Sequence, residues 1–502
     1  MSISFLQILR KSSRLTLVNS AGVALNFLAA SYAANKFGPD VYGRISFVLL
    51  WVSYAGLMRP GVFDGGQRQL INLLGRGDSP GARRVQNIGF SGDLLWNVVP
   101  AVLLLAASAR AADPVRHFGF TLAPFLFLAQ STSRMLGGLF LAHQEFETYT
   151  AACTLRALAQ PALLLTLIHF AGPQALLAAP LLAECGIALY YVRRASEIGI
   201  QWHFERATAF ELMKVGLPLS LAAVAYWLYR LAGPTSIAGF LSVAALGVYA
   251  FASKIIDQVT RFFGDFSNVL MPGFWSSLAR AGNPRALLPD ISRLTVYLVL
   301  LACFACNLIQ AVASFSVTAF LPRFTSSVPV LEILAFNTVL LTITMPAGLL
   351  LDSTVVNKQR LHVGIWAFGS ALNYSVNYAV LARGRGIAAI AWNDIWVQIV
   401  VAALVYATAH GVLFVRFTDA WRFYAPLGGL LVCCASIFML LRVPLLAAVG
   451  SSGYGRGFGT FCSRCLLVAA VWLPIAVYFR KRHRFVASHE TFLEVAASVD
   501  SC

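Results

Sequence analysis

Charged residues are scarce in this chain. Only 12% of its 502 residues are Asp, Glu, Lys or Arg, about half of the share that is usual in soluble globular domains. No polar stretch is longer than about 25 residues, which is too short for a separate soluble domain. Apolar runs of about 20 residues instead recur from end to end, each long enough to cross a bilayer as a helix. We therefore expect an all-α integral membrane protein with about fourteen transmembrane helices.

Catalytic and nucleotide-binding motifs are also missing. The patterns H-E-x-x-H, G-x-S-x-G and G-x-x-x-x-G-K-[ST] do not occur, and the glycine-rich stretch 450–459 joins two apolar runs. Cys303 and Cys306 have C-x-x-C spacing but lie inside an apolar run, with no second Cys/His pair at zinc-finger spacing. We expect no enzyme activity, no cofactor and no metal, and we interpret the thiols as small buried hydrophobes.

Acidic residues are the scarcer of the charged kinds, and the net charge is +17. A soluble protein with this excess would suggest nucleic acid as a partner, but no basic domain is present that could bind it. Lys and Arg instead concentrate in the loops on the side that holds both chain ends, so the positive-inside rule predicts cytoplasmic termini. The first apolar run follows Arg10, Lys11 and Arg14, and we interpret it as a retained span. We expect the basic loops to contact anionic lipid head groups.

The order of the apolar runs predicts the organisation of the chain. We expect an N-lobe of six helices at 1–192, a cytoplasmic connector at 193–214, a C-lobe of six helices at 215–410, two further helices at 411–480 and a cytoplasmic tail at 481–502. The expected spans are about Leu15–Asn35, Val41–Phe63, Ile88–Ala109, Phe118–Leu141, Thr150–Phe170, Gln174–Tyr191, Val215–Ala232, Leu241–Phe263, Leu294–Phe320, Val328–Leu351, Leu361–Leu381, Ile387–Ala409, Tyr424–Leu441 and Phe461–Phe479.

A weak internal repeat accompanies this division. Gly38 and Pro39 are followed by Val-Tyr-Gly at the start of the second span, and Gly233 and Pro234 are followed by Leu-Gly-Val-Tyr at the start of the eighth. The period of about 200 residues fits two halves related by duplication, which in transporters places the substrate site between the halves.

Charges inside the expected spans are the strongest functional signal. Lys254, Asp257, Arg261 and Asp265 share one face of the helix at 247–272. A charge at the bilayer centre costs about 3 kcal/mol on insertion scales, so such residues normally face a polar cavity or a partner. We therefore expect this stripe to line a cavity and the protein to move a charged substrate.

Further cations lie at a similar depth, on the cytoplasmic side of the membrane middle. Together they form an excess of positive charge, which suits an anionic ligand such as phosphate, because a guanidinium matches phosphate oxygens and stays charged when it is desolvated. Snorkelling to the interface and pairing with acids are the structural alternatives. The candidate binding residues are Arg59, Arg134, Arg156, Lys254 and Arg261, and the candidate cavity acids for ion coupling are Asp64, Glu184 and Asp257.

Polar and aromatic side chains form a second group. Asn373 and Asn377 lie one turn apart on the eleventh span, and Asn393 and Asp394 lie on the twelfth. Their amides can bind sugar hydroxyls, but we favour hydrogen bonds between helices.

Three stretches carry a resemblance to a known family: residues 35–70 (NKFGPDVYGRISFVLLWVSYAGLMRPGVFDGGQRQL), 212–274 (LMKVGLPLSLAAVAYWLYRLAGPTSIAGFLSVAALGVYAFASKIIDQVTRFFGDFSNVLMPGF) and 384–404 (GRGIAAIAWNDIWVQIVVAAL). Together they resemble the polysaccharide transporters, or Wzx-type flippases, of the multidrug/oligosaccharidyl-lipid/polysaccharide (MOP) superfamily. The resemblance implies two six-helix lobes around a central cavity and alternating access driven by a proton or sodium gradient.

The same resemblance implies the substrate. It would be an undecaprenyl-diphosphate-linked oligosaccharide, flipped to the periplasmic leaflet for exopolysaccharide or O-antigen synthesis beside polymerase machinery. Cavity arginines hold the diphosphate in such relatives, and Arg59, Arg134, Arg156 and Arg261 are the matching positions here. One departure is that Met58, Arg59 and Pro60 stand where the family's second helix ends in an apolar turn.

Three other functions are open on the sequence. A cation-coupled multidrug exporter has the same fold, but a basic cavity disfavours cationic drugs. A flippase for a lipid-linked peptidoglycan precursor has a marker stretch on the second helix that is not evident here. A membrane glycosyltransferase or polymerase needs catalytic carboxylates in a large outer loop, and the longest outer loop, near 443–459, contains no acid.

Overall fold

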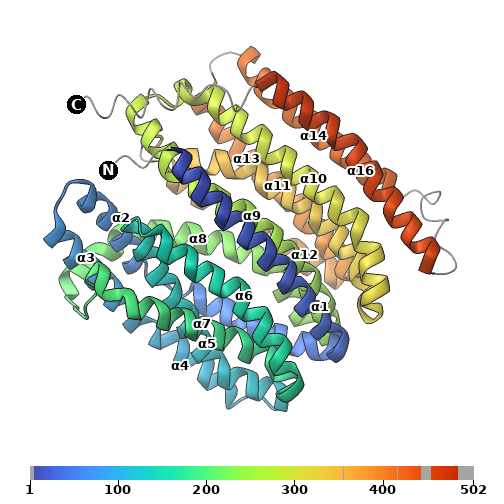
Figure 1. Ribbon diagram of the computed structural model, residues 1–502, viewed down its shortest axis with the longest axis horizontal. Coiled ribbons are helices and arrows are strands. Elements are labelled where there is room, and N and C mark those ends of the chain that lie inside the picture. The colour runs from blue at the N-terminus through green and yellow to red at the C-terminus, as the bar shows by residue number, and fades with distance from the viewer. Residues whose placement is uncertain (1–4, 354, 415–416, 442–453, 484–502) are drawn as a thin grey trace. The chain divides into compact units, whose positions relative to one another are not determined.

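The computed structural model describes residues 5–353, 355–414, 417–441 and 454–483. Every regular element in these ranges is a helix (Figure 1), so the predicted all-α membrane class is confirmed. The α-helices are α1 (Phe5–Leu57), α2 (Val62–Gly75), α3 (Ser79–Trp96), α4 (Val98–Ser108), α5 (Pro114–Ala142), α6 (Phe146–Phe170), α7 (Ala175–Arg194), α8 (Arg206–Phe240), α9 (Val243–Ala281), α10 (Leu288–Phe320), α11 (Val328–Leu351), α12 (Gln359–Ala382), α13 (Ile387–Leu413), α14 (Phe417–Leu441) and α16 (Tyr454–His483). The short 3-10 helices are η1 (Gly172–Gln174), η2 (Ala195–Ile198), η3 (Pro284–Leu287) and η4 (Pro322–Ser327).

The expected spans fall mostly in helices, but not every one of these helices is apolar enough to pass as a membrane span by itself. The described residues contain nine helices that are long and apolar enough to cross a membrane, and up to eleven when two bent pairs are included. The first expected span and most of the second form the single helix α1, kinked at Gly38 (φ 79°), but the second span, Val41–Phe63, runs past the end of α1 at Leu57 into α2, which begins at Val62. The eighth and eleventh expected spans are α9 and α12, whose charged and amide side chains lower their hydropathy.

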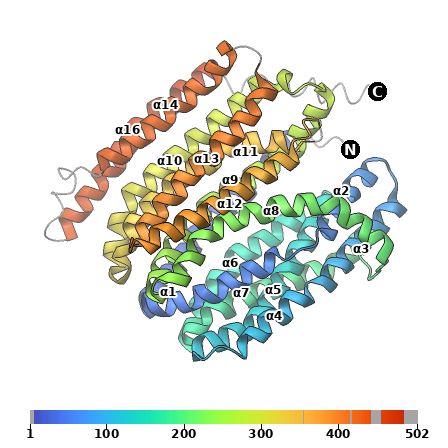
Figure 2. The ribbon, with the colours of Figure 1, turned by 180° about the vertical axis from the view of Figure 1, so that it is seen from behind.

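Contacts divide the chain into two units. The first consists of Val18–Lys254 and Lys358–Val397, and the second of the described parts of Met1–Leu17, Ile255–Asn357 and Gln398–Cys502. In the first unit α5 packs against α4 and α7, α7 against α6, and α8 against α2 and α12 (Figures 1 and 2). In the second unit α10 packs against α11, α14 and α16. The first unit holds the site described below.

Helices α1 and α9 touch through two glycines. A Cβ atom on Gly43 would clash with the carbonyl oxygen of Val243, and one on Gly247 would clash with the carbonyl oxygen of Pro39. The two backbones are therefore in direct contact, which only glycine permits. Both glycines belong to the short stretches on which the predicted internal repeat rests, and the repeat itself stays a prediction.

A buried polar network joins α9, α12 and α13. Asp394 accepts hydrogen bonds from Tyr249 (2.6 Å) and Asn373 (2.9 Å). Asn393 donates to Asn373 (2.9 Å) and to Asn377 (2.8 Å). All five side chains are buried. Because these amides bond to one another and to the carboxylate, they act between helices, as the favoured interpretation of the sequence expected.

The glycine contact makes a prediction about stability. Gly247→Ala places a methyl group against the backbone of α1, so we expect it to lower the free energy of unfolding by about 1–3 kcal/mol. Gly239→Ala in α8, where no atom lies within 4 Å of the added Cβ, is the control. Thermal melting of both purified variants in detergent checks this, and equal melting temperatures would contradict the close approach.

Candidate functional site

A break between α1 and α2 places the first of the predicted arginines. Helix α1 ends at Leu57 and α2 begins at Val62, with the two axes bent by 54°. Pro60 has no N–H to donate to a continuing helix, and Gly61 adopts a left-handed conformation (φ 83°) that favours glycine. Trp96 Nε1 of α3 donates to the carbonyl oxygen of Met58 (2.6 Å). The break thus leaves Arg59 half-buried on a short fixed turn within the membrane segment.

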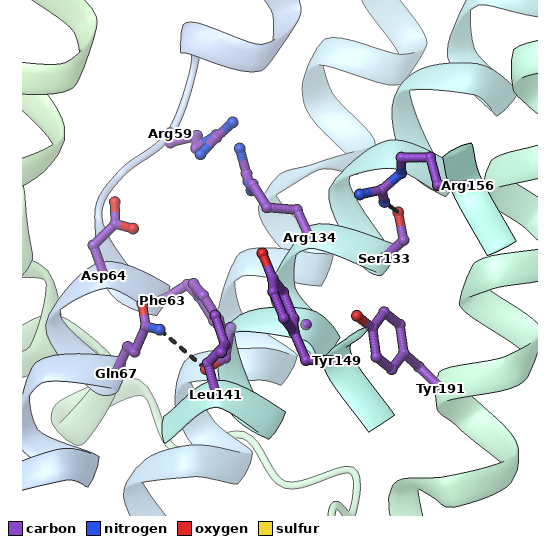
Figure 3. A pocket seen from close by; sticks show the side chains of 12 residues that line it. Arg59, Phe63, Asp64, Gln67, Ser133, Arg134, Leu141, Tyr149, Arg156 and Tyr191 are labelled. Carbon is purple, nitrogen blue, oxygen red and sulfur yellow. Dashed lines mark hydrogen bonds between the residues drawn. The ribbon is translucent and has the colours of Figure 1, made fainter. Parts of the chain in front are cut away.

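A cavity of about 260 Å³ opens beside this break. Three of the five predicted cations, Arg59, Arg134 and Arg156, line it, and so does Asp64 (Figure 3). Its walls come from the start of α2 and from α5, α6 and α7, all within the first unit. The other lining residues are Phe63, Gln67, Ser133, Gly137, Gly138, Leu141, Tyr149 and Tyr191.

Arg156 is neutralised inside the protein. Its Nε and Nη2 atoms each lie 2.9 Å from an oxygen of Glu184 in a bidentate pair between α6 and α7. Ser133 Oγ of α5 donates to Glu184 Oε2 (2.6 Å). The carboxylate therefore accepts hydrogen bonds from two helices while it sits on a third, and this arrangement suits a structural tie as much as a ligand contact.

Arg59 and Arg134 are placed differently. Arg134 Nη2 lies 3.4 Å from Ser131 Oγ, and among the described residues no carboxylate lies within ion-pair distance of either guanidinium. Asp64, the nearest candidate acid in the cavity, accepts a hydrogen bond from Ser220 Oγ (2.5 Å) of α8. Figure 3 shows the Arg59 and Arg134 side chains directed toward the same part of the cavity. Two cations are thus available to a ligand.

Two polar residues close to this site escaped the sequence analysis. Asp93 on α3 and Asn97, the residue between α3 and α4, are one helical turn apart and each only 1% exposed. Asn97 Nδ2 donates to Ser131 Oγ (2.8 Å), the atom that Arg134 also approaches. Asp93 lies within electrostatic range of Arg59 and Asp64. The signal was present in the sequence, because Asp93 is a charged residue inside the third expected span.

The remaining predicted residues lie elsewhere. Lys254 is half-buried on α9 and does not line the cavity, and Asp257 follows it on the same helix. Arg261 and Asp265 belong to α9 by their backbone, and their side chains lie outside the part of the structure that is described. The stripe on α9 therefore stays a prediction, separate from the three arginines that the structure brings together.

The chain can now be compared with known proteins. A family model described as "Polysaccharide biosynthesis protein" matches residues 112–284. The structure of the lipid II flippase MurJ in an inward closed conformation aligns with 94% of this chain and 99% of its own, with a TM-score of 0.69 and 10% identity. The chain shares the fold of this flippase. The predicted resemblance to polysaccharide transporters is supported by the family model over residues 112–284.

Other MOP structures agree with this assignment. An inward-facing multidrug resistance MATE transporter aligns with 79% of this chain and 98% of its own (TM-score 0.58, 14% identity). A MOP transporter from Pyrococcus furiosus, described as having a binding pocket of reverse polarity, aligns with 82% and 98% (TM-score 0.55, 15% identity). No curated protein sequence gives a significant match.

The Arg156–Glu184 pair can be tested by a double-mutant cycle. Glu184→Met leaves a guanidinium without its countercharge, and Arg156→Met leaves the carboxylate, so we expect each to lower the free energy of unfolding by about 1–3 kcal/mol after allowance for partial exposure. The double variant should recover most of this loss because no charge is left unpaired. Thermal melting of the three variants measures the coupling, and simple additivity would show that the pair is not a structural tie.

Proposed function

We propose that this protein flips lipid-linked oligosaccharide diphosphates from the cytoplasmic to the periplasmic leaflet of a bacterial inner membrane, for exopolysaccharide or O-antigen synthesis. The observation that carries the proposal is the presence of Arg59 and Arg134 in one membrane cavity, with no ion-pair partner among the described residues. A negatively charged substrate would offset the free-energy cost of holding these two positive charges inside the membrane.

The chemistry of the two side chains narrows the substrate class. A guanidinium presents parallel N–H groups that match two oxygens of one phosphate, and it remains protonated in a dry environment. Two guanidiniums at one site suit a diphosphate, in which each phosphate can accept from one of them. The side-chain amide of Gln67, which lines the cavity, donates one N–H to the carbonyl oxygen of Gly138 (3.0 Å), and its second N–H is a further donor for phosphate or for the first sugar.

Orientation and partners follow from the same proposal. Both termini lie in the cytoplasm, the helices of 1–192 and 215–410 act as two lobes in alternating access, and the flipped lipid passes to a polysaccharide polymerase. Coupling to a proton or sodium gradient supplies the energy, and Asp64, Glu184 and Asp257 are its candidate acids.

A second candidate is a flippase for lipid II, the lipid-linked peptidoglycan precursor. Its support is the alignment with MurJ over 94% of this chain, together with a cavity whose arginines suit any prenyl diphosphate. A drug exporter for cations receives less support, because the two arginines would repel its substrate.

The arginines supply the test. Arg59→Gln and Arg134→Gln each remove one diphosphate contact, so we expect at least a tenfold loss of glycan export at normal membrane protein level, which corresponds to about 1.4 kcal/mol or more. Lysine at either position keeps the positive charge but lacks the parallel N–H groups of the guanidinium, so it should retain only part of the glycan export. Arg385→Gln, at an exposed loop position, makes the same charge change away from the cavity and should export normally.

Two outcomes separate the candidates. Normal export by both glutamine variants removes the diphosphate role. If the variants instead fail to complement loss of a lipid II flippase, while the wild-type chain does so, the substrate is the peptidoglycan precursor. Flipping of each purified fluorescent lipid in proteoliposomes measures the preference directly.

A further inference from the structure

Asp93 and Asn97 each have a buried side-chain oxygen without a hydrogen-bond partner among the described residues. Both are buried, with 1% of their surface exposed. In the described part of the chain, no group donates a hydrogen bond to Asp93 Oδ2 or to Asn97 Oδ1. The backbone N–H of Asn97 donates to the carbonyl oxygen of Asp93 (3.0 Å), so the two residues are one turn apart on the same helical face. Two buried acceptors without donors are therefore carried by residues that are neighbours on this face.

One proton would satisfy both atoms. A protonated Asp93 carries an O–H group, which can donate to Asn97 Oδ1 one turn away. Asn97 Nδ2 is already engaged with Ser131 Oγ (2.8 Å), so the amide oxygen is the atom that remains to be paired. A buried carboxylate without hydrogen bonds is costly, whereas the neutral acid is not. The geometry thus favours a protonated Asp93 whenever no cation is close.

Whether Asp93 has a cation beside it depends on the charged residues of the surrounding helices. Arg59 at the helix break and Asp64 on α2 act on it electrostatically, whereas Arg134 on α5 approaches Ser131, the residue to which Asn97 donates. Helix α4 carries no charged residue. On α8, which packs against α3 near Val85 and Ile88, the nearby charged groups Glu211 and Lys214 pair with each other (2.8 Å). Arg59 is therefore the cation whose engagement matters most to Asp93.

We propose that Asp93 is a proton-binding residue linked to the anion site: it takes up a proton when Arg59 engages the diphosphate, and its ionised form draws Arg59 back and weakens binding. This inference rests on the proposed function. The proton comes from solvent and forms an O–H bond on Asp93, while no other covalent bond changes. Because protonation and anion binding favour each other, linkage requires that affinity rises as pH falls.

The probe must not titrate in the range of the experiment. A farnesyl-diphospho-N-acetylglucosamine is a diphosphate diester, whose charge is constant between about pH 6 and about pH 8. Binding to the full chain in nanodiscs is measured by calorimetry at both pH values, in two buffers of different ionisation enthalpy. The difference in heat between buffers reports protons taken up on binding, and this readout needs no variant.

We expect wild-type affinity to fall about fivefold or more from the lower to the higher pH, with net proton uptake. Asp93→Asn cannot ionise, so its affinity should match the low-pH wild type at both pH values, with no proton uptake. Asp64→Asn is the matched control. It removes the same charge beside Arg59, but Asp64 is held by Ser220, so this variant should bind more tightly and keep the pH dependence.

The outcomes distinguish the two proposals. Absence of probe binding by the wild type at either pH overturns the proposed function. Tight binding with no proton uptake, or a pH dependence that survives in Asp93→Asn, overturns the role of Asp93 alone. If the pH dependence disappears in Asp64→Asn instead, the linked acid is Asp64 and the inference about Asp93 fails.

Discussion

The bidentate pair between Arg156 and Glu184 is the interaction on which the candidate site depends. It joins α6 to α7, and Ser133 adds α5 to the same carboxylate. Without it, three helices would meet around two unpaired charges in a low-dielectric interior, which costs several kcal/mol. With it, these helices form a fixed wall, and the other two arginines can face a cavity. Arg59 and Arg134 have no carboxylate within ion-pair distance among the described residues, and Asp64 and Asp93 act on Arg59 only at longer range.

The helix break supplies the opposite wall by a different means. A charged residue in the middle of a regular membrane helix must find a partner or reach the interface. Arg59 lies instead on a turn that Pro60 and Gly61 enforce. The backbone carbonyl groups at this turn lack helical partners and need other hydrogen-bond donors. The hydrogen bond from Trp96 to Met58 satisfies one of them. The unpaired backbone groups of the helix break and the Arg59 side chain therefore lie in the same polar environment.

The sequence predicted most of this architecture, for a physical reason. Apolar runs encode membrane helices locally, so the expected spans fall mostly in helices. The break at 58–61 was not predicted, because the expected span Val41–Phe63 continues across it. Depth in the membrane brought Arg59, Arg134 and Arg156 into one group, and the structure places them in one cavity. Which cation is neutralised could not be predicted, because Glu184 lies 28 residues from Arg156. The cavity lies within the segment 59–191, and Lys254 of the charged stripe on α9 does not line it.

The contact between Gly43 and Gly247 has a consequence for how such a chain can diverge. A side chain gained at Gly43 would meet the backbone of α9 at Val243, and one gained at Gly247 would meet the backbone of α1 at Pro39. A larger residue at one position cannot be offset by a smaller residue at the other, because glycine is already the smallest. This pair is therefore closed to the compensating exchanges of volume through which other buried contacts can change.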